Sequence, residues 1–401
     1  MKNLLVLEQL RRIKRRKNKR EKYDPLGTEL KTKRINKDIT LEAAARKICS
    51  LSYLSKLENN KIEPNFSILR ELCERQNITE DDINKLYESG VEIENALALM
   101  IKGKVNEIEE YLNTLNFENY RIDLIKMIFH LAKKDYDLAL VDYEKLICVC
   151  KTMLDDDFIV FSLLCGFLDM ATYRFVEAIN DVINLNYYKL SEHKEMARNL
   201  ILFMSLSIIG NIDSITYYNK LERYFYNTLD VELMNNVRYF LGIYYIKSNS
   251  LINFNNYIKL ISNKKHQESL MLMQALVNKD YYTISNYKEN DLLKEAKLIY
   301  YYVTDRNRFK EEVSKIDSRF YDFVLDPLLL NYLVLDNNDD KYQYINDVMV
   351  PSLVNSKDKT LLDFVLKELT TITTNRNIYK LFTYLCENKF FDIKVGTFDE
   401  L

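Results

Sequence analysis

Apolar residues recur at helical spacing along most of this 401-residue chain, and the sharpest pattern lies near its start. There, Thr40 and Ser50 each stand where a side-chain oxygen can cap the first turn of a helix. The alanines at 43–45 give the first helix a small-residue core, and Leu54 and Leu57, three residues apart, give the second helix an apolar face. Two short helices joined by a tight turn predict a helix-turn-helix.

Three more helices are predicted around this pair. The first begins at Pro25, because proline suits the first helical turn. Another carries an apolar stripe that starts at Phe66. The fifth begins with a capping-box pattern at 79–82 and is expected to end at Gly90, since glycine often terminates a helix. Five short helices predict a compact domain over residues 25–90.

Beyond residue 90 the helical stripes come in pairs, and the polar breaks within the pairs recur about every 26 to 39 residues. This is the period of tetratricopeptide-like repeats, in which each repeat is a helical hairpin. Two further pairs are expected within 320–395. The seven clearest breaks lie at 102–104, 133–135, 172–174, 210–212, 247–249, 278–280 and 305–307. We therefore predict an all-α chain, in which residues 91–401 form a right-handed α-solenoid of tetratricopeptide-like hairpins after the N-terminal five-helix domain.

Composition agrees with this class and limits the chemistry. Only 7 Gly and 4 Pro are present, whereas β-rich folds use many such turn residues. The six cysteines are scattered without zinc or disulfide spacing, the three histidines lie far apart, and no Gly-rich phosphate loop occurs. We expect no metal, no cofactor, no catalytic residue and no enzymatic activity. No secretory signal or membrane-spanning run is recognisable, so a cytoplasmic protein without a membrane partner is expected.

The net charge of −2 conceals a basic head and an acidic remainder. Residues 1–61 carry 18 Lys and Arg against 7 Asp and Glu, while residues 62–401 carry 39 against 52. Nine of the twelve residues at 11–22 are basic. This predicts a mobile basic arm over residues 1–24, which either follows phosphates or remains a solvated tail. This charge asymmetry predicts that only the basic N-terminal part of the chain binds a polyanion, and that this partner is double-stranded DNA.

Helical geometry separates base-reading from phosphate-contacting positions on the second helix of the motif. With Leu54 and Leu57 turned inward, residues of the opposite face near the helix start can reach base edges. These base-reading candidates are Leu51, Ser52, Ser55 and Lys56. Residues at the rim are better placed for phosphates, which hold register without reading sequence. The phosphate candidates are Arg46, Lys47, Tyr53, Asn59 and Lys61. A helical hairpin that merely packs is the alternative.

Residues 26–78 resemble the Xre-type helix-turn-helix domain of the RRNPP regulators, in particular of their PlcR-like branch. The resemblance rests on Leu26-Gly27, Ile48-Cys49, Ser52, Leu54-Ser55-Lys56-Leu57-Glu58 and Pro64. It implies a bacterial quorum-sensing regulator whose helical repeats bind a short re-imported signalling peptide, and it implies that Glu58 holds Arg34. Two positions depart from the family. Leu41 replaces a Gln that supports a phosphate contact, and Asn60 replaces a Gly.

Asparagines in the first helices of the repeats are candidates for contacting such a peptide. Aligning Gly210 with Lys247 places Asn199 and Asn236 at the same repeat position. A carboxamide offers one acceptor and two donors to a peptide unit, and RRNPP regulators are similar in using first-helix asparagines in this way. The predicted peptide-binding residues are Asn199, Asn236, Arg198, Asn235, Arg238 and Asn331. Because the chain is rich in Asn, solvated surface residues remain the alternative.

These patterns together predict a sequence-specific transcription regulator. It is expected to form a homodimer through its repeat domain and to shift its DNA-binding competence when a peptide binds. Two alternatives stay open. The repeats could bind a protein partner, such as a response regulator or an antirepressor, or they could sense a small metabolite.

Overall fold

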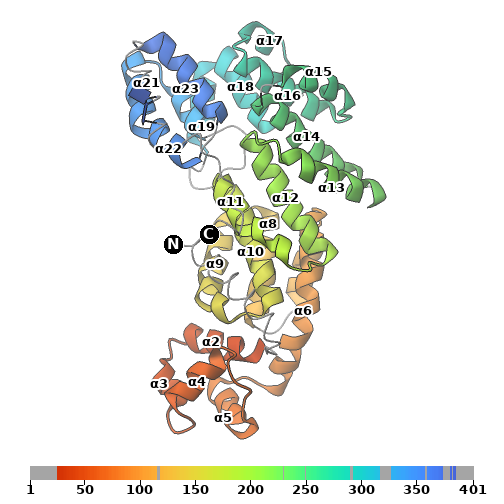
Figure 1. Ribbon diagram of the computed structural model, residues 1–401, viewed down its shortest axis with the longest axis vertical. Coiled ribbons are helices and arrows are strands. Elements are labelled where there is room, and N and C mark those ends of the chain that lie inside the picture. The colour runs from red at the N-terminus through yellow and green to blue at the C-terminus, as the bar shows by residue number, and fades with distance from the viewer. Residues whose placement is uncertain are drawn as a thin grey trace. The chain divides into compact units, whose positions relative to one another are not determined.

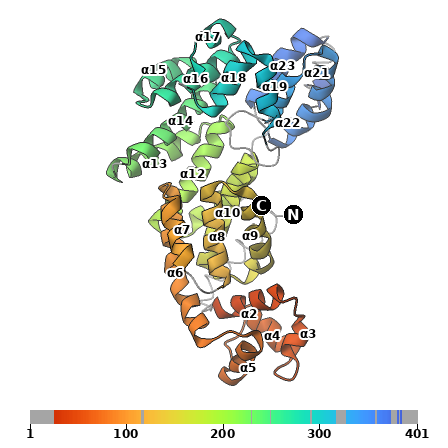
Figure 2. The same cartoon turned by 180° about the vertical axis from the view of Figure 1, so that it is seen from behind.

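The computed structural model of the protein describes residues 25–114, 118–228, 230–248, 250–289, 292–316, 327–356, 359–373, 380–381 and 383–384. All regular elements in these ranges are helices (Figures 1 and 2). The prediction of an all-α fold, with a helix-turn-helix followed by paired helices, is confirmed. Contacts divide the chain into two compact units. The first runs to Leu168 and adds Asn180–Arg198, and the second comprises Asp169–Ile179 and the residues from Asn199 onward.

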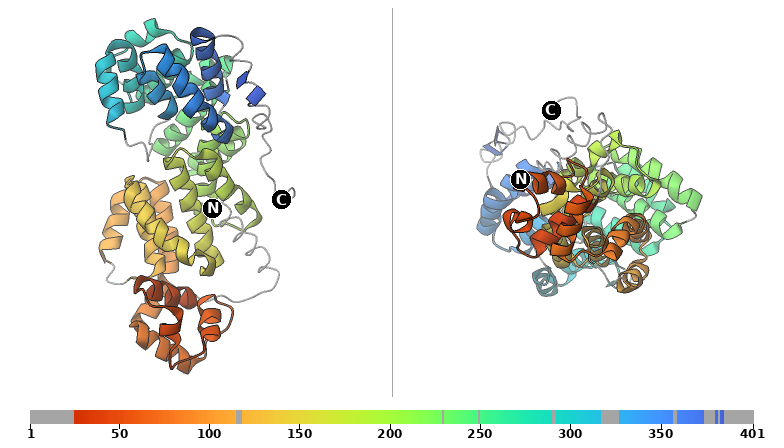
Figure 3. Two further views of the ribbon diagram at one scale, coloured as in Figure 1. Left: turned by 90° about the vertical axis from the view of Figure 1, so that its left-hand side faces the viewer. Right: turned by 90° about the horizontal axis from the view of Figure 1, so that it is seen from below.

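Helices near the start of the described chain, drawn from red to orange, lie close together in Figure 3. The first five helices pack around one small apolar core, in which Leu30, Leu54 and Leu72 are fully buried. These helices are α2 (Pro25–Asn36), α3 (Leu41–Ala45), α4 (Leu51–Glu58), α5 (Phe66–Gln76) and α6 (Glu80–Ile101). Thr40 and Ser50 each accept a hydrogen bond from the backbone N–H three residues on, as the capping pattern predicts. The predicted capping box at the start of α6 is also present.

Two apolar assignments in this domain are wrong. Ala43 is exposed, because α3 is only five residues long and buries just the two alanines that follow against the core. Phe66 is 84% exposed, because it is the first residue of α5 and lies before the helix reaches the core. The buried residues of that helix are Leu72, Cys73 and Gln76. The start of α5 therefore presents an aromatic ring to solvent.

The end predicted for the fifth helix is also wrong, because α6 continues through Gly90 to Ile101. Glycine is tolerated in the middle of this helix for a packing reason. A Cβ added at Gly90 would lie 2.9 Å from the Nη1 atom of Arg121, which belongs to a later helix. The glycine therefore permits a close approach between helices instead of ending one. The domain boundary at residue 90 stays a prediction.

The helices that follow lead from the first unit into the second. They are α7 (Val105–Thr114), α8 (Tyr120–Lys133), α9 (Tyr136–Val149), η1 (Cys150–Thr152), α10 (Asp155–Ala171), α11 (Phe175–Val182), η2 (Ile183–Tyr187) and α12 (Glu192–Ile208). Helix α8 packs against both α6 and α9, so the first repeat helices adjoin the long helix that leaves the N-terminal domain. Helices α10, α11 and α12 each divide their residues between the two units.

The second unit continues the helical pairs. Its remaining helices are α13 (Ser214–Thr228), α14 (Val231–Lys247), α15 (Leu251–Tyr257), η3 (Ile258–Leu260), α16 (Lys264–Val277), α17 (Tyr281–Ser285), α18 (Lys294–Thr304), α19 (Arg306–Ser314), α20 (Pro327–Val334), α21 (Asn338–Tyr344), η5 (Ile345–Met349), α22 (Val350–Ser356) and α23 (Lys359–Ile372). The last hairpins predicted, over 320–395, lie partly outside the described residues. None of the helices in the described ranges combines the length and apolar character needed to cross a bilayer.

All seven breaks predicted from the sequence overlap the junction of two helices, although Lys133 and Lys247 still belong to the helix before their break and Arg306 already begins the helix after its break. Five contain a residue with φ between 57° and 71°, the left-handed conformation that ends one helix and redirects the chain. These residues are Gly103, Lys134, Tyr173, Gly210 and Lys279. A Cβ added at Gly210 would lie 3.3 Å from backbone and side-chain atoms of Lys247. The two turns that the repeat alignment pairs are therefore in contact.

Candidate nucleic-acid interface

Helix α4 presents one face to solvent and buries the other. Leu54 and Leu57 are 0% and 3% exposed, so they fix the orientation of the helix on the core. Of the four base-reading candidates, Leu51, Ser52 and Lys56 are exposed, and Ser55 is half-buried. The structure thus places these four residues on the face of α4 that is not packed on the core, with Lys56 in the last turn of the helix.

A buried ion pair ties α4 to α2. Arg34 donates from Nε and Nη2 to the two carboxylate oxygens of Glu58, at 2.7 and 2.8 Å. It also donates from Nη1 to the carbonyl of Ile39 at 3.1 Å. The hydrogen bond to Glu58 raises the pKa of Arg34 above its ordinary value. This pair agrees with the role implied for Glu58 by the resemblance, and it removes that carboxylate from the surface that would face phosphates.

Two further basic residues hold backbone carbonyls of the N-terminal domain, and sequence reasoning missed both. Arg75 of α5 donates through Nη1 to the carbonyls of Ala43, Ala44 and Arg46, so it closes the end of α3. Lys37 donates to the carbonyl of Gln76 at 2.6 Å. Their charges stabilise the domain internally, since helix C-termini attract cations.

The phosphate candidates separate into two groups. Arg46, Lys47 and Lys61 are exposed. Tyr53 is half-buried, and its hydroxyl accepts a hydrogen bond at 2.7 Å from the backbone N–H at position 65. Asn59 donates its side-chain amide at 2.6 Å to a carbonyl one turn earlier. The three cations are accessible at the rim of α4, whereas the other two side chains also hold the loops around it.

Leu41 and Phe66 lie near the exposed face of α4 but were not among the residues predicted to contact DNA. Leu41 is half-buried and packs against the domain core, so the departure from Gln places an apolar contact there. Phe66 follows the residue whose N–H binds the Tyr53 hydroxyl, so its exposed ring stands next to a residue bonded to α4. The apolar stripe of α5 predicts that Phe66 is a core residue, and nothing in the sequence indicates that it is exposed.

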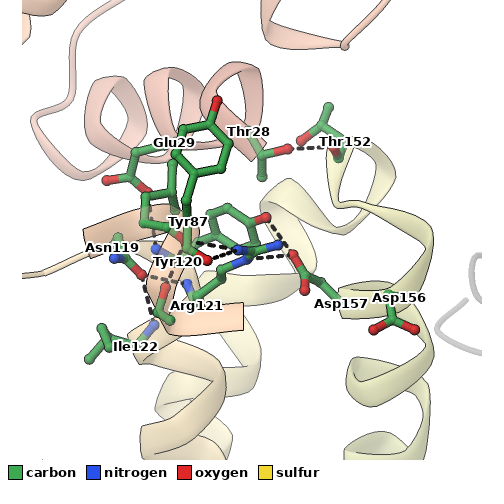
Figure 4. Close-up of polar contacts among 12 residues, drawn as sticks. Thr28, Glu29, Tyr87, Asn119, Tyr120, Arg121, Ile122, Thr152, Asp156 and Asp157 are labelled. Carbon is green, nitrogen blue, oxygen red and sulfur yellow. Dashed lines mark hydrogen bonds and ion pairs between the residues drawn. The ribbon is translucent and has the colours of Figure 1, made fainter. Parts of the chain in front are cut away.

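A buried polar network joins α2 to the later helices of the first unit (Figure 4). Glu29 accepts a hydrogen bond from the backbone N–H of Tyr120 at 3.1 Å. The Tyr120 hydroxyl and the Arg121 Nε both donate to Asp157 Oδ2, at 2.6 and 2.9 Å, and Arg121 Nη1 donates to the carbonyl of Leu86 at 2.8 Å. Burial raises the pKa of Glu29 to about 7. Burial also raises the pKa of Asp157, against the opposing charge of Arg121.

The predicted peptide-binding residues are not equivalent in the structure. Asn199 on α12 is 5% exposed, whereas Asn236 on α14 is exposed, so the matched repeat position does not give matched accessibility. Asn235 accepts a hydrogen bond from Ser262 Oγ at 2.9 Å. The remaining three differ as well, since Arg198 is buried, Arg238 half-buried and Asn331 exposed on α20. Asn235, Asn236 and Arg238 share one helix.

Comparisons with known proteins bear on the N-terminal domain. Residues 30–83 match the family model described as Helix-turn-helix, of Xre type. A crystal structure of Bacillus thuringiensis PlcR in complex with the peptide PapR7 and DNA is similar, with 16% sequence identity, a TM-score of 0.33, and coverage of 64% of this chain and 98% of that chain. The comparison with curated proteins found no match. The chain carries a DNA-binding helix-turn-helix domain, as its sequence predicts.

Proposed function

We propose that this protein is a cytoplasmic, sequence-specific transcription regulator of the RRNPP type, which binds its operator as a homodimer and senses a short signalling peptide through its repeat helices. One observation carries the DNA-binding part. Leu51, Ser52 and Lys56 are exposed on a helix whose opposite face is buried in a domain that matches a helix-turn-helix family. Lysine can donate to guanine O6 and N7, and leucine can pack on a thymine methyl.

The peptide-sensing part is supported by the second unit. An array of hairpins offers helix faces along which an extended peptide can lie. On α14, Asn236 exposes a carboxamide, and Asn235 and Arg238 lie beside it in sequence, partly accessible. These three residues supply acceptors, donors and a positive charge from one helix.

The DNA-binding part is tested by selecting binding sites for the full chain from a random duplex pool, followed by mobility-shift titration of the selected duplex against random DNA. We expect a defined sequence that binds at least about a thousandfold more tightly than random DNA at physiological salt. Enrichment of no sequence would contradict the proposal. A selected site with two-fold symmetry would support the homodimer.

The peptide-sensing part is tested with synthetic peptides from any short secreted reading frame beside the gene, added to the same titration. A peptide that shifts DNA affinity for the wild-type chain should lose most of its effect on Asn236→Ala. The matched control is Asn253→Ala, an exposed asparagine of α15 outside the predicted set. An equal loss in both variants, or no response to any such peptide, would count against this assignment.

A further inference from the structure

The turn after α9 reaches the end of the DNA-reading helix. The side-chain amide of Asn60, two residues past the end of α4, donates to the carbonyl of Thr152 at 2.6 Å and to Thr28 Oγ1 at 3.1 Å. Thr28 Oγ1 donates in turn to the same carbonyl. Figure 4 shows Thr28 of α2 facing Thr152 of η1. We refer to Thr28, Asn60 and Thr152 as the Thr152 clamp.

The choice of residue at position 60 calls for an explanation. Asn60 has φ of 53°, a left-handed conformation that glycine adopts at lower cost. The side chain that asparagine adds contacts α2 and η1, which lie far from it in sequence. A hydrogen-bonding function therefore accounts for asparagine where backbone geometry alone would favour glycine.

Tight packing holds the clamp in place. A Cβ added at Gly27 would lie 2.1 Å from Asn60 Oδ1 and 2.3 Å from the carbonyl oxygen of Leu57, so α2 lies directly against the end of α4. Thr28 and Thr152 are 0% and 2% exposed. The Thr152 carbonyl is thus a buried acceptor that receives two donors from the DNA-binding domain, and removing them would leave it unsatisfied.

We propose that Asn60 is a positioning residue for DNA recognition. Through the Thr152 clamp, the turn between α9 and α10 sets the orientation of the reading helix at its C-terminal end, in addition to the covalent connection through α6. A displacement of η1 is passed directly to α4. This inference rests on the proposed DNA-binding function for its biological meaning, but the mechanical link can be measured without DNA.

The mechanical test measures the distance distribution between two nitroxide-bearing unnatural amino acids, placed in the full chain at exposed Glu71 of α5 and Lys145 of α9. Asn60→Gly keeps the left-handed backbone and removes the clamp donor, and Thr28→Val added to it removes the second donor. We expect a distribution at least about twice as broad as that of the wild type. The matched control is Asn77→Gly, which caps α5 at φ of 55° and makes no side-chain hydrogen bond that the described part of the chain shows.

The DNA test compares the selected operator with random duplex. Asn60→Gly should lose about tenfold in affinity for the operator while its affinity for random DNA stays within about twofold, because orientation affects base contacts more than phosphate attraction. An unchanged distance distribution in the double variant would overturn the inference, and so would an equal loss on both duplexes. If the wild-type chain binds no sequence specifically, the proposed function fails, while the distance measurement still decides the clamp.

Discussion

Gly90 lies against the guanidinium of Arg121 so closely that a methyl group there would be 2.9 Å from Nη1. The guanidinium cannot move aside freely. Its Nη1 donates to the Leu86 carbonyl and its Nε to Asp157, and the Arg121 side chain is 7% exposed. The helix that leaves the DNA-binding domain and the helix that starts the next hairpin are therefore joined at a point where side-chain volume is excluded.

Gly90→Ala should destabilise the protein although alanine is the better helix former. The helix-propensity gain is about 1 kcal/mol, whereas overpacking against a fixed group costs about 1 to 3 kcal/mol. We expect a net loss of about 1 kcal/mol in the free energy of unfolding, measured by urea denaturation. In an Arg121→Lys background, which lacks the Nη1 atom, the same change should be neutral or stabilising. If Gly90→Ala instead stabilises the otherwise wild-type chain, the close approach of the two helices has no energetic consequence.

Arg34→Ala should lower the free energy of unfolding by about 3 kcal/mol, because it leaves the carboxylate of Glu58 buried without its cation. Glu58 is 2% exposed, so water cannot replace the lost partner. Arg70→Ala is the control, since its ion pair with Glu74 is exposed on both sides and should contribute less than about 1 kcal/mol. Similar losses in the two variants would contradict the importance given to burial.

Glu29 should make stability depend on pH. Burial raises its pKa from the ordinary value of 4.5 to about 7, so between these values the folded protein binds the proton and the unfolded chain does not. The contribution of Glu29 to stability should therefore fall as pH rises from 4.5 to 7 and level off above 7. The total change is on the order of 3 kcal/mol.

Glu29→Gln isolates this effect, because its side-chain carbonyl can still accept from the Tyr120 N–H. The measurement is the difference in unfolding free energy between variant and wild type, taken at several pH values so that other titrating groups cancel. The free energy of unfolding of Glu29→Gln should increase relative to that of the wild type as pH rises toward 8. A difference that stays constant with pH would show that Glu29 titrates normally in the folded protein.

Lys56 and Lys61 should differ in what they contribute to DNA binding. Lys56→Ala should weaken operator binding by about 1 to 3 kcal/mol and relax selectivity at one base pair, because Lys56 is exposed on the proposed base-reading face. Lys61→Ala should weaken operator and random binding alike and reduce the salt slope by about 1. If Lys56→Ala lowers the affinity for random and operator DNA equally, Lys56 contacts phosphates and does not read a base.

Local rules predicted much of the fold. The caps at Thr40 and Ser50 depend on backbone groups three residues away, and the breaks depend on short polar runs, so both are readable from neighbouring residues. The helix end predicted at Gly90 and the core position predicted for Phe66 are wrong because tertiary packing decides both. At Gly90 the deciding contact comes from a later helix, and at Phe66 the core ends before the residue is reached. The accessibility of Asn199 likewise depends on the helices packed around α12, which repeat alignment does not include.

The 22 residues of α6 form one uninterrupted rod about 33 Å long. In terms of leverage, a tilt of about 10° at its Ile101 end would carry its Glu80 end sideways by about 6 Å, and the rise of DNA is about 3.4 Å per base pair. A helix broken at Gly90 would absorb such a tilt in the joint. The unbroken rod instead converts a small angular error into a displacement of nearly two base pairs. If the chain recognises an operator as we propose, the fidelity of that recognition depends on how firmly the two ends of α6 are held.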